Sequence, residues 1–178
     1  MSSKPTAISH QPPAGSAPDT LRFAEESDLP AIETMINAAF EVERTFKLEP
    51  RLDPEHTRKY FRQGHFLLAE DEVGLAGCVF VELSGECAYL GLLSVDPSRQ
   101  KTGLGRRLAT AAEEFAGQRD AFRMELTVLN LRTDLPPYYR KLGYIEVGEE
   151  PMPMEWARRI NRPCHFIRMA KSLDRREP

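Results

Sequence analysis

The sequence has few cysteines, no long hydrophobic run and no strong excess of either charge. Cys78, Cys87 and Cys164 are odd in number and widely spaced in apolar surroundings. They fit reduced, buried thiols in a cytosolic protein better than a disulfide framework or a zinc site. The longest uncharged apolar runs are Val73–Val81 and Cys87–Val95. Because a membrane helix needs about twenty apolar residues, we expect no membrane span.

Charged and metal-binding side chains are also unremarkable in number and spacing. Lys and Arg total 24 against 27 for Asp and Glu, which gives a net charge of −3. Such a chain has no global field that attracts nucleic acid or anionic lipid. The four histidines are scattered without ligand spacing, so we expect no metal. The N-terminus lacks the apolar stretch of a signal peptide, which favours a cytoplasmic protein.

The chain length and composition fit one domain with an ordinary core. It has 178 residues, of which 41% are hydrophobic and 29% are charged. Residues 1–18 carry four of the fourteen prolines and no hydrophobic period, which predicts a flexible leader. We therefore expect a single domain over residues 19–173, followed by a short tail over 174–178.

Apolar spacing and turn residues predict the order β-α-α-β-β-β-α-β-α-β-β, which is an α+β fold. Short glycine-containing links make the second, third and fourth strands candidates for antiparallel hairpins. The predicted strands are Leu21–Glu25, Phe66–Glu70, Leu75–Leu83, Cys87–Val95, Arg123–Asn130, Tyr144–Val147 and Cys164–Ala170. The predicted helices are Leu29–Phe40, Pro54–Gln63, Leu104–Ala116 and Leu135–Leu142.

The most informative segment is the loop Gln100–Gly105, which joins a strand to a helix. Gly103 and Gly105 let the backbone approach a ligand, and free N–H groups at a helix N-terminus bind anions. Lys101 and Arg106 stand at the positive end of the helix dipole, where a bound pyrophosphate would favour them. The third glycine of a dinucleotide loop and the Gly-Lys-Ser/Thr of a P-loop are absent. A plain turn with solvated arginines is the structural alternative.

A second segment, Tyr139–Tyr144, places a tyrosine four residues before a glycine–aromatic pair. Together with Gln100–Gly105, it resembles the GNAT superfamily of acyl-CoA-dependent N-acetyltransferases, and the closing Phe166–Lys171 is similar to that family's last strand. The resemblance spans roughly Leu21 to Leu173. It implies a mixed, mostly antiparallel sheet of about seven strands, flanked by about four helices.

The resemblance also implies where acetyl-CoA binds. Main-chain groups of Leu93, Ser94 and Val95 would hold the pantetheine arm and the thioester carbonyl. Gly91 in the same strand marks a bulge or serves packing. The residues that would wrap the pyrophosphate are Gln100, Lys101, Thr102, Gly103, Leu104, Gly105 and Arg106.

The same resemblance gives Tyr139 the role of general acid near the CoA sulfur. A packed aromatic with a satisfied hydroxyl is the alternative for Tyr139, and Tyr138 is expected in the core or in the acceptor wall. Asn130 is assigned to the CoA arm, although it lies nine residues before Tyr139, about two more than in many relatives.

The acceptor is expected to be a primary amine, but neither its identity nor the general base follows from the sequence. Glu82, Glu41, Glu43 or water are the candidates for the base, and each carboxylate is otherwise a solvated surface group. Acceptor specificity is expected in the loops Glu41–Asp53 and Pro151–Pro163. A non-catalytic acyl-CoA sensor is the alternative function, and a nucleotide-binding protein is a third. The sequence also leaves open a homodimer that forms through exposed strands.

Overall fold

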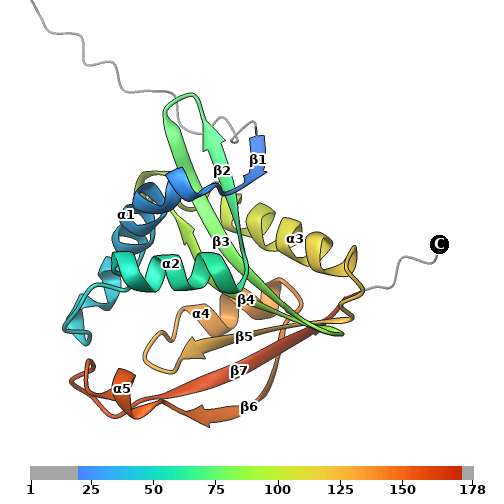
Figure 1. The fold of residues 1–178 in the computed structure, drawn as a ribbon. Coiled ribbons are helices and arrows are strands. Elements are labelled where there is room, and N and C mark those ends of the chain that lie inside the picture. Colours follow the sequence, from blue (N-terminus) through green and yellow to red (C-terminus); the bar gives the residue numbers. More distant parts are fainter. Residues whose placement is uncertain (1–19, 174–178) are drawn as a thin grey trace, which may run out of the picture.

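The sheet of this protein is built from seven strands in the order β1-β2-β3-β4-β5-β7-β6 (Figure 1). The structure is a computed structural model that describes residues 20–173, so the predicted leader and tail lie outside the described residues. β4 and β5 pair in parallel, and all other neighbouring strands pair antiparallel. The α+β prediction of a mixed, mostly antiparallel seven-stranded sheet is therefore confirmed.

The order of strands and longer helices agrees with the sequence prediction. The strands are β1 Thr20–Phe23, β2 His65–Asp71, β3 Gly74–Ser84, β4 Cys87–Val95, β5 Arg123–Leu129, β6 Ile145–Pro151 and β7 His165–Ser172. The helices are α1 Leu29–Ala39, α2 Pro54–Gln63, α3 Leu104–Gly117, α4 Leu135–Lys141 and the single turn α5 Met154–Ala157. No helix within residues 20–173 is long and apolar enough to cross a membrane.

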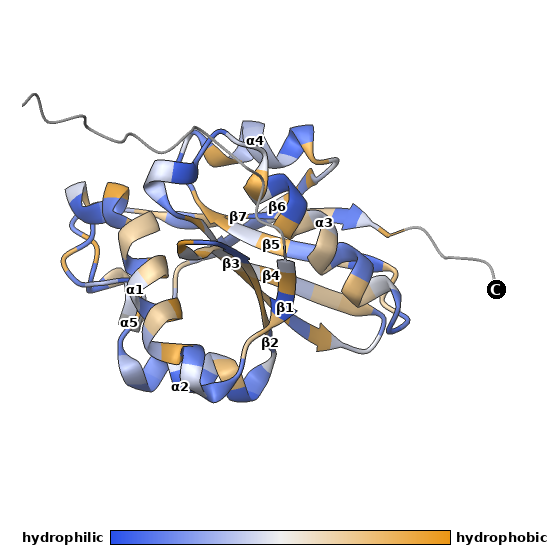
Figure 2. Cartoon of the chain, turned by 90° about the horizontal axis from the view of Figure 1, so that it is seen from above, coloured by the Kyte–Doolittle hydropathy of each residue, from blue (hydrophilic) through white to orange (hydrophobic). Residues whose placement is uncertain are grey.

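Helices cover both faces of the sheet, with α1 and α2 on one face and α3 and α4 on the other (Figure 2). The alternation along β2 follows from this arrangement. Phe66 and Leu68 pack in the cluster that contains α1, whereas Leu67 and Ala69 pack in the cluster that contains α3. A strand buried on both faces needs apolar residues at every position. This explains why the four consecutive residues from Phe66 to Ala69 are all apolar.

β4 and β5 pair only at their first three residues and then separate. The last register pair joins Tyr89 to Glu125, and the Tyr89 hydroxyl lies 2.9 Å from Oγ1 of Thr127. Beyond this contact, the register of β4 with β3 shifts between Gly91 and Ser94, and Leu92 between them has φ 51°. The irregularity bends β4 away from β5.

Two loops that look irregular in sequence contain local structure. Residues Glu41–Thr45 form a 3-10 turn, and the loop Pro151–Pro163 contains α5. The two loops meet in an antiparallel bridge between Lys47 and Ile160. Sequence periodicity did not predict these features, because each depends on a partner segment far away in the chain.

The three cysteines are free thiols in the structure. Cys78 is completely buried, whereas Cys87 and Cys164 are only partly buried. The expectation of three buried thiols is therefore correct for Cys78 alone.

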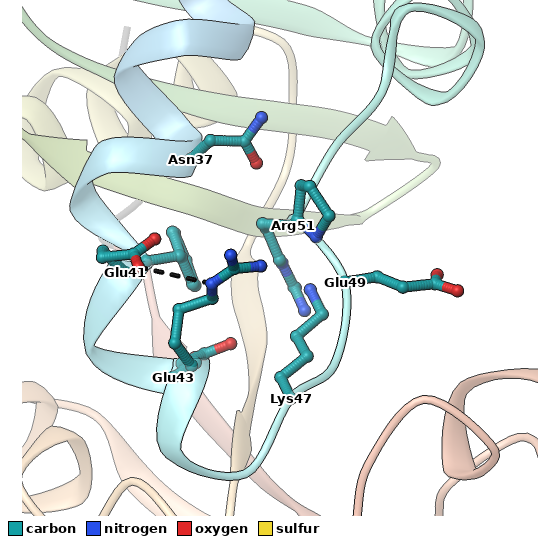
Figure 3. A pocket seen from close by; sticks show the side chains of 9 residues that line it. Asn37, Glu41, Glu43, Lys47, Glu49 and Arg51 are labelled. Carbon is teal, nitrogen blue, oxygen red and sulfur yellow. Dashed lines mark ion pairs between the residues drawn. The ribbon is translucent and has the colours of Figure 1, made fainter.

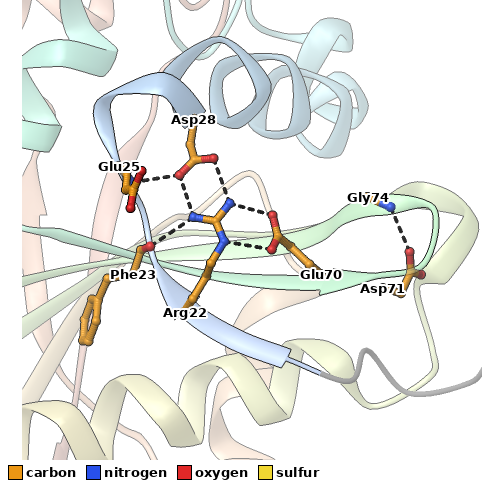
Figure 4. A network of polar contacts seen from close by, with 7 residues as sticks. All are labelled: Arg22, Phe23, Glu25, Asp28, Glu70, Asp71 and Gly74. Carbon is orange, nitrogen blue, oxygen red and sulfur yellow. Dashed lines mark hydrogen bonds and ion pairs between the residues drawn. The ribbon is translucent and has the colours of Figure 1, made fainter.

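Arg22 on the edge strand β1 forms the densest polar cluster near the N-terminal end of the domain (Figure 4). Its guanidinium donates to both carboxylate oxygens of Asp28, at 2.7 and 2.8 Å, and to both of Glu70, at 2.8 and 2.6 Å. Asp28 also accepts the backbone N–H of Glu25. The cluster joins β1, β2 and the start of α1, and its hydrogen bonds lower the pKa of both carboxyl groups.

We predict that Arg22→Met lowers the free energy of unfolding at pH 7 by about 1 kcal/mol. The ordinary pKa values are 3.8 for Asp28 and 4.5 for Glu70, and both are lowered in the folded protein. The stabilisation is therefore complete above these values and is lost as the pH falls through the lowered ones. Urea unfolding at pH 7 and below pH 4 measures the difference.

Arg44→Met is the control, because Arg44 is exposed and makes a single ion pair with Glu41. It should change the unfolding free energy little at either pH. An Arg22 effect that is equally large in acid would contradict the ion-pair explanation.

Candidate functional site

The separation of β4 from β5 creates a cleft of about 450 Å³. Its walls come from β4, β5, α4 and the N-terminal turn of α3. Phe40 and Arg51 also line it. The predicted site residues that line it are Leu93, Val95, Gln100, Lys101, Gly103, Leu104, Gly105, Arg106 and Tyr139. Residues from four separate elements therefore meet where the two strands diverge.

The loop before α3 lines the cleft and has an unusual backbone conformation. Lys101 has φ 65° and Gly103 has φ 88°, both in the left-handed region. The first helical hydrogen bond of α3 runs from N of Arg107 to O of Gly103. The N–H groups of the preceding residues of the first turn have no acceptor within the helix. Such a turn, with the positive end of the helix dipole behind it, forms an anion-binding concavity.

Gly105 packs closely against the side chain of Tyr138. A Cβ atom at this position would lie 2.8 Å from the hydroxyl oxygen of Tyr138. Tyr138 itself lines the cleft, and its pKa is raised by burial. The second glycine of the loop thus lets α4 approach the N-terminus of α3, a packing role that the sequence motif does not reveal.

Tyr139 lies in the wall of the cleft with 8% of its surface exposed. Its ring packs edge-on between the rings of Tyr138 and Tyr144, with centroids 5.2 and 5.7 Å away. Burial raises the pKa of its phenol well above the usual value. Tyr139 therefore stays protonated at neutral pH and can donate a proton or a hydrogen bond to a group in the cleft.

Three predicted cofactor-binding residues do not line the cleft. Ser94 is buried and donates its hydroxyl to O of Leu92, 2.9 Å away. The hydroxyl of Thr102 donates to O of Arg99 at 2.7 Å. The side chain of Asn130 accepts the N–H of His165 at 3.0 Å. The hydroxyls of Ser94 and Thr102 and Oδ1 of Asn130 are thus used within the fold.

Arg132 lines the cleft, although the sequence reasoning did not select it. It is paired with Asp134 at 2.9 Å and with the buried Glu43 at 3.2 Å. Arg132 stands seven residues before Tyr139, two closer than Asn130. The unusual spacing of Asn130 is the signal in the sequence that points to it.

The candidate bases differ in their positions. Glu43 lines the cleft, but its carboxylate is already paired with Arg132. Glu41 is exposed and paired with Arg44, and Glu82 on β3 lies outside the cleft wall. Within residues 20–173, no group of three potential ligands is arranged to hold a metal ion.

These features place a glycine-containing turn at the N-terminus of α3 and the buried phenol of Tyr139 around one cleft in an α+β fold. The sequence profile of the Acetyltransferase (GNAT) family matches residues 29–144. The chain belongs to this family. A search of curated proteins found no similar sequence.

Solved structures show the same fold at low sequence identity. The ribosomal-protein-S18-alanine N-acetyltransferase of Escherichia coli has a TM-score of 0.65 at 19% identity, covering 87% of this chain and 94% of that one. The structure of yncA from Salmonella typhimurium with its cofactor acetyl-CoA has a TM-score of 0.67 at 18% identity, and the match covers 89% of this chain and 96% of that one. N-acetylglutamate synthase of Neisseria gonorrhoeae, complexed with coenzyme A and N-acetyl-glutamate, has a TM-score of 0.67 at 20% identity. The match covers 88% of this chain and 35% of that one.

We predict that Gly105→Ala lowers the free energy of unfolding by about 1 kcal/mol, because the new methyl group overlaps the Tyr138 hydroxyl. Combining it with Tyr138→Phe should recover most of the loss, since the overlapping oxygen is removed. Chemical unfolding of the two single variants and the double variant measures this coupling.

Gly117→Ala is the control on the same helix, where a Cβ atom would meet no neighbour within 4 Å. It should be neutral or slightly stabilising, because alanine favours a helix over glycine. Additive effects of Gly105→Ala and Tyr138→Phe would show that the tyrosine does not constrain this position.

Proposed function

We propose that this protein transfers the acetyl group of acetyl-CoA to a primary amine by direct attack in a ternary complex. The observation that carries the proposal is the pairing of two groups across one cleft. An anion-binding turn lies at Gly103, and a buried, protonated phenol lies at Tyr139. The free thiols Cys78, Cys87 and Cys164 support a cytoplasmic location as part of the same proposal.

The turn before α3 would hold the diphosphate of acetyl-CoA. Lys101 and Gly103 both have left-handed backbone and line the cleft, and a turn of this kind would bind the diphosphate through its N–H groups. Arg106 lines the same region and adds positive charge. The unpaired edge of β4, at Leu93 and Val95, is available for the pantetheine arm and the thioester. The structures of yncA with acetyl-CoA and of N-acetylglutamate synthase with coenzyme A support this ligand.

The reaction forms a bond from the amine nitrogen to the thioester carbonyl carbon and breaks the C–S bond. Backbone N–H groups on the free edge of β4 would stabilise the oxyanion of the tetrahedral intermediate. The departing thiolate takes the phenolic proton of Tyr139. The attacking nitrogen releases its extra proton to solvent as the intermediate collapses, and the phenolate of Tyr139 takes up a proton from solvent after the product leaves. A thiol pKa of about 8.5 makes this transfer uphill, so a hydrogen bond from the phenol supplies part of the stabilisation.

The amine must lose a proton before or during attack. At pH 7, deprotonating an amine with a pKa of about 10.4 costs roughly 4.6 kcal/mol. In the described part of the chain, the two carboxylates that line the cleft, Glu43 and Asp134, are both paired with Arg132. This pairing favours water as the proton acceptor. It is also the observation that favours the second candidate function, an acyl-CoA sensor without turnover.

Tyr139→Phe separates the two functions. If the protein is a transferase, kcat for thiol release should fall about 100-fold or more, because the proton donor is lost. The Kd for CoA should change little. Tyr144→Phe is the control, because its hydroxyl donates to Glu113 at 3.0 Å outside the cleft.

Thiol release from acetyl-CoA with a panel of primary amines measures these rates. Turnover that is insensitive to Tyr139→Phe would remove the phenol from the mechanism. CoA binding without turnover on any amine would support the sensor.

Gly103→Ala tests the diphosphate turn. Alanine at φ 88° is strained by about 1 kcal/mol or more, so the turn should distort and CoA affinity should fall at least tenfold. Gly85→Ala is matched, because Gly85 also has positive φ and open space around it, in the β3–β4 turn. It should lose similar stability while keeping the same CoA affinity by calorimetry. Equal losses of affinity would argue against the proposed diphosphate site.

A further inference from the structure

A second, smaller cavity of about 150 Å³ adjoins the large cleft. It is formed by the end of α1 and the segment that leads to α2 (Figure 3). Phe40, Glu43 and Arg51 line both cavities. The small cavity therefore lies next to the large cleft, with these three residues in the wall of both.

The acidic side chains around the small cavity are already neutralised by arginines. Each of its three glutamates has an ion-pair partner among the described residues. The pairs are Glu41 with Arg44 at 3.3 Å, Glu43 with Arg132 at 3.2 Å, and Glu49 with Arg159 at 3.1 Å. Glu43 and Glu49 also attract Lys47 electrostatically, but its Nζ makes no hydrogen bond to either of them.

Two further cations, Lys47 and Arg51, line the cavity. Lys47 is 5% exposed, and its Nζ has no hydrogen-bond partner in residues 20–173. Nε of Arg51 is also buried and unpaired. Figure 3 shows the ends of the two side chains facing one another within the cavity. Burial and the nearby Arg51 lower the pKa of Lys47 to about 8.

Backbone contacts hold Lys47 in this buried position. Lys47 forms an antiparallel bridge with Ile160, and N of Leu48 donates to O of Arg159 at 2.9 Å. The guanidinium of Arg51 lies 5.0 Å from the ring of Phe40 and 5.5 Å from that of Trp156. Aromatic rings attract cations only modestly and supply no carboxylate. Buried, unpaired cations are costly, so a ligand that neutralises them would bind with a large advantage.

We propose that Lys47 and Arg51 bind a carboxylate of the acceptor, so that the acceptor is an amine that carries a carboxylate group. This proposal rests on the proposed function, because it assigns the substrate class of that site. A guanidinium edge with a free Nε–H matches the two oxygens of a carboxylate, and the ammonium adds a third donor. The small volume suits a carboxylate better than a larger anion.

Equilibrium binding tests the proposal without requiring turnover. Trp156 is the only tryptophan in the sequence and lies 6.0 Å from Nζ of Lys47 and 5.5 Å from the guanidinium of Arg51. Its fluorescence should therefore report a ligand at these cations. The probes are matched pairs with CoA present: L-leucine against isopentylamine, L-phenylalanine against phenethylamine, and 4-aminobutyrate against butylamine.

In at least one pair, the carboxylate member should bind at least tenfold more tightly than the amine that lacks it. Lys47→Met and Arg51→Met should each abolish this preference. Lys47→Met should also raise the melting temperature of the free protein, because a buried unpaired charge is replaced by an apolar chain of similar length. Lys59→Met, at an exposed position on α2, should change neither the preference nor the melting temperature.

Equal binding of both members in all three pairs would overturn the proposal. A carboxylate preference that survives both Lys47→Met and Arg51→Met would also overturn it. The proposed function fails separately: a carboxylate preference without acetyl transfer to any amine refutes catalysis and leaves the anion site standing. Acetyl transfer without a carboxylate preference refutes only the present inference.

Discussion

The site depends on the early end of pairing between β4 and β5. Three register pairs and the contact between the Tyr89 hydroxyl and Thr127 hold the strands together, and beyond them the edge of β4 is free. In the interior of a sheet, the backbone N–H and C=O groups of a strand are normally hydrogen-bonded to both neighbouring strands. The fold leaves them open here, and it places the N-terminus of α3 and the phenol of Tyr139 at the opening. Without the separation of the strands, neither group would face a cavity.

Unfavourable local features gather around this opening. Leu92 and Lys101 adopt positive φ, which costs a side-chain-bearing residue about 1 kcal/mol or more. Nζ of Lys47 and Nε of Arg51 are buried and have no hydrogen-bond partner within the described residues. By contrast, the hydrophobic clusters on the two faces of the sheet are regular, and the cluster around Arg22 is fully paired. Strain and unpaired charge in a stable domain are typical of sites that have been shaped for a ligand.

The sequence predicted the fold well because its signals are local. Short apolar runs, glycine-containing turns and helical stripes specify β2, β3, β4 and α3 without reference to distant segments. The same holds for Gly103, whose positive φ only glycine adopts easily. Arg132 and Lys47 were not selected, because their positions depend on long-range contacts with Glu43 and Ile160. A lysine in a polar loop gives no sign in the sequence that its ammonium will be buried.

The bridge between Lys47 and Ile160 has a consequence for how acceptor preference can change in this fold. The loop that lines the small cavity and the loop that contains α5 are far apart in the chain, yet each supplies backbone partners to the other. Transplanting one loop from a related enzyme would leave those partners mismatched. Substrate range should therefore evolve, or be redesigned, by changing both segments together or by exchanging side chains on an unchanged backbone.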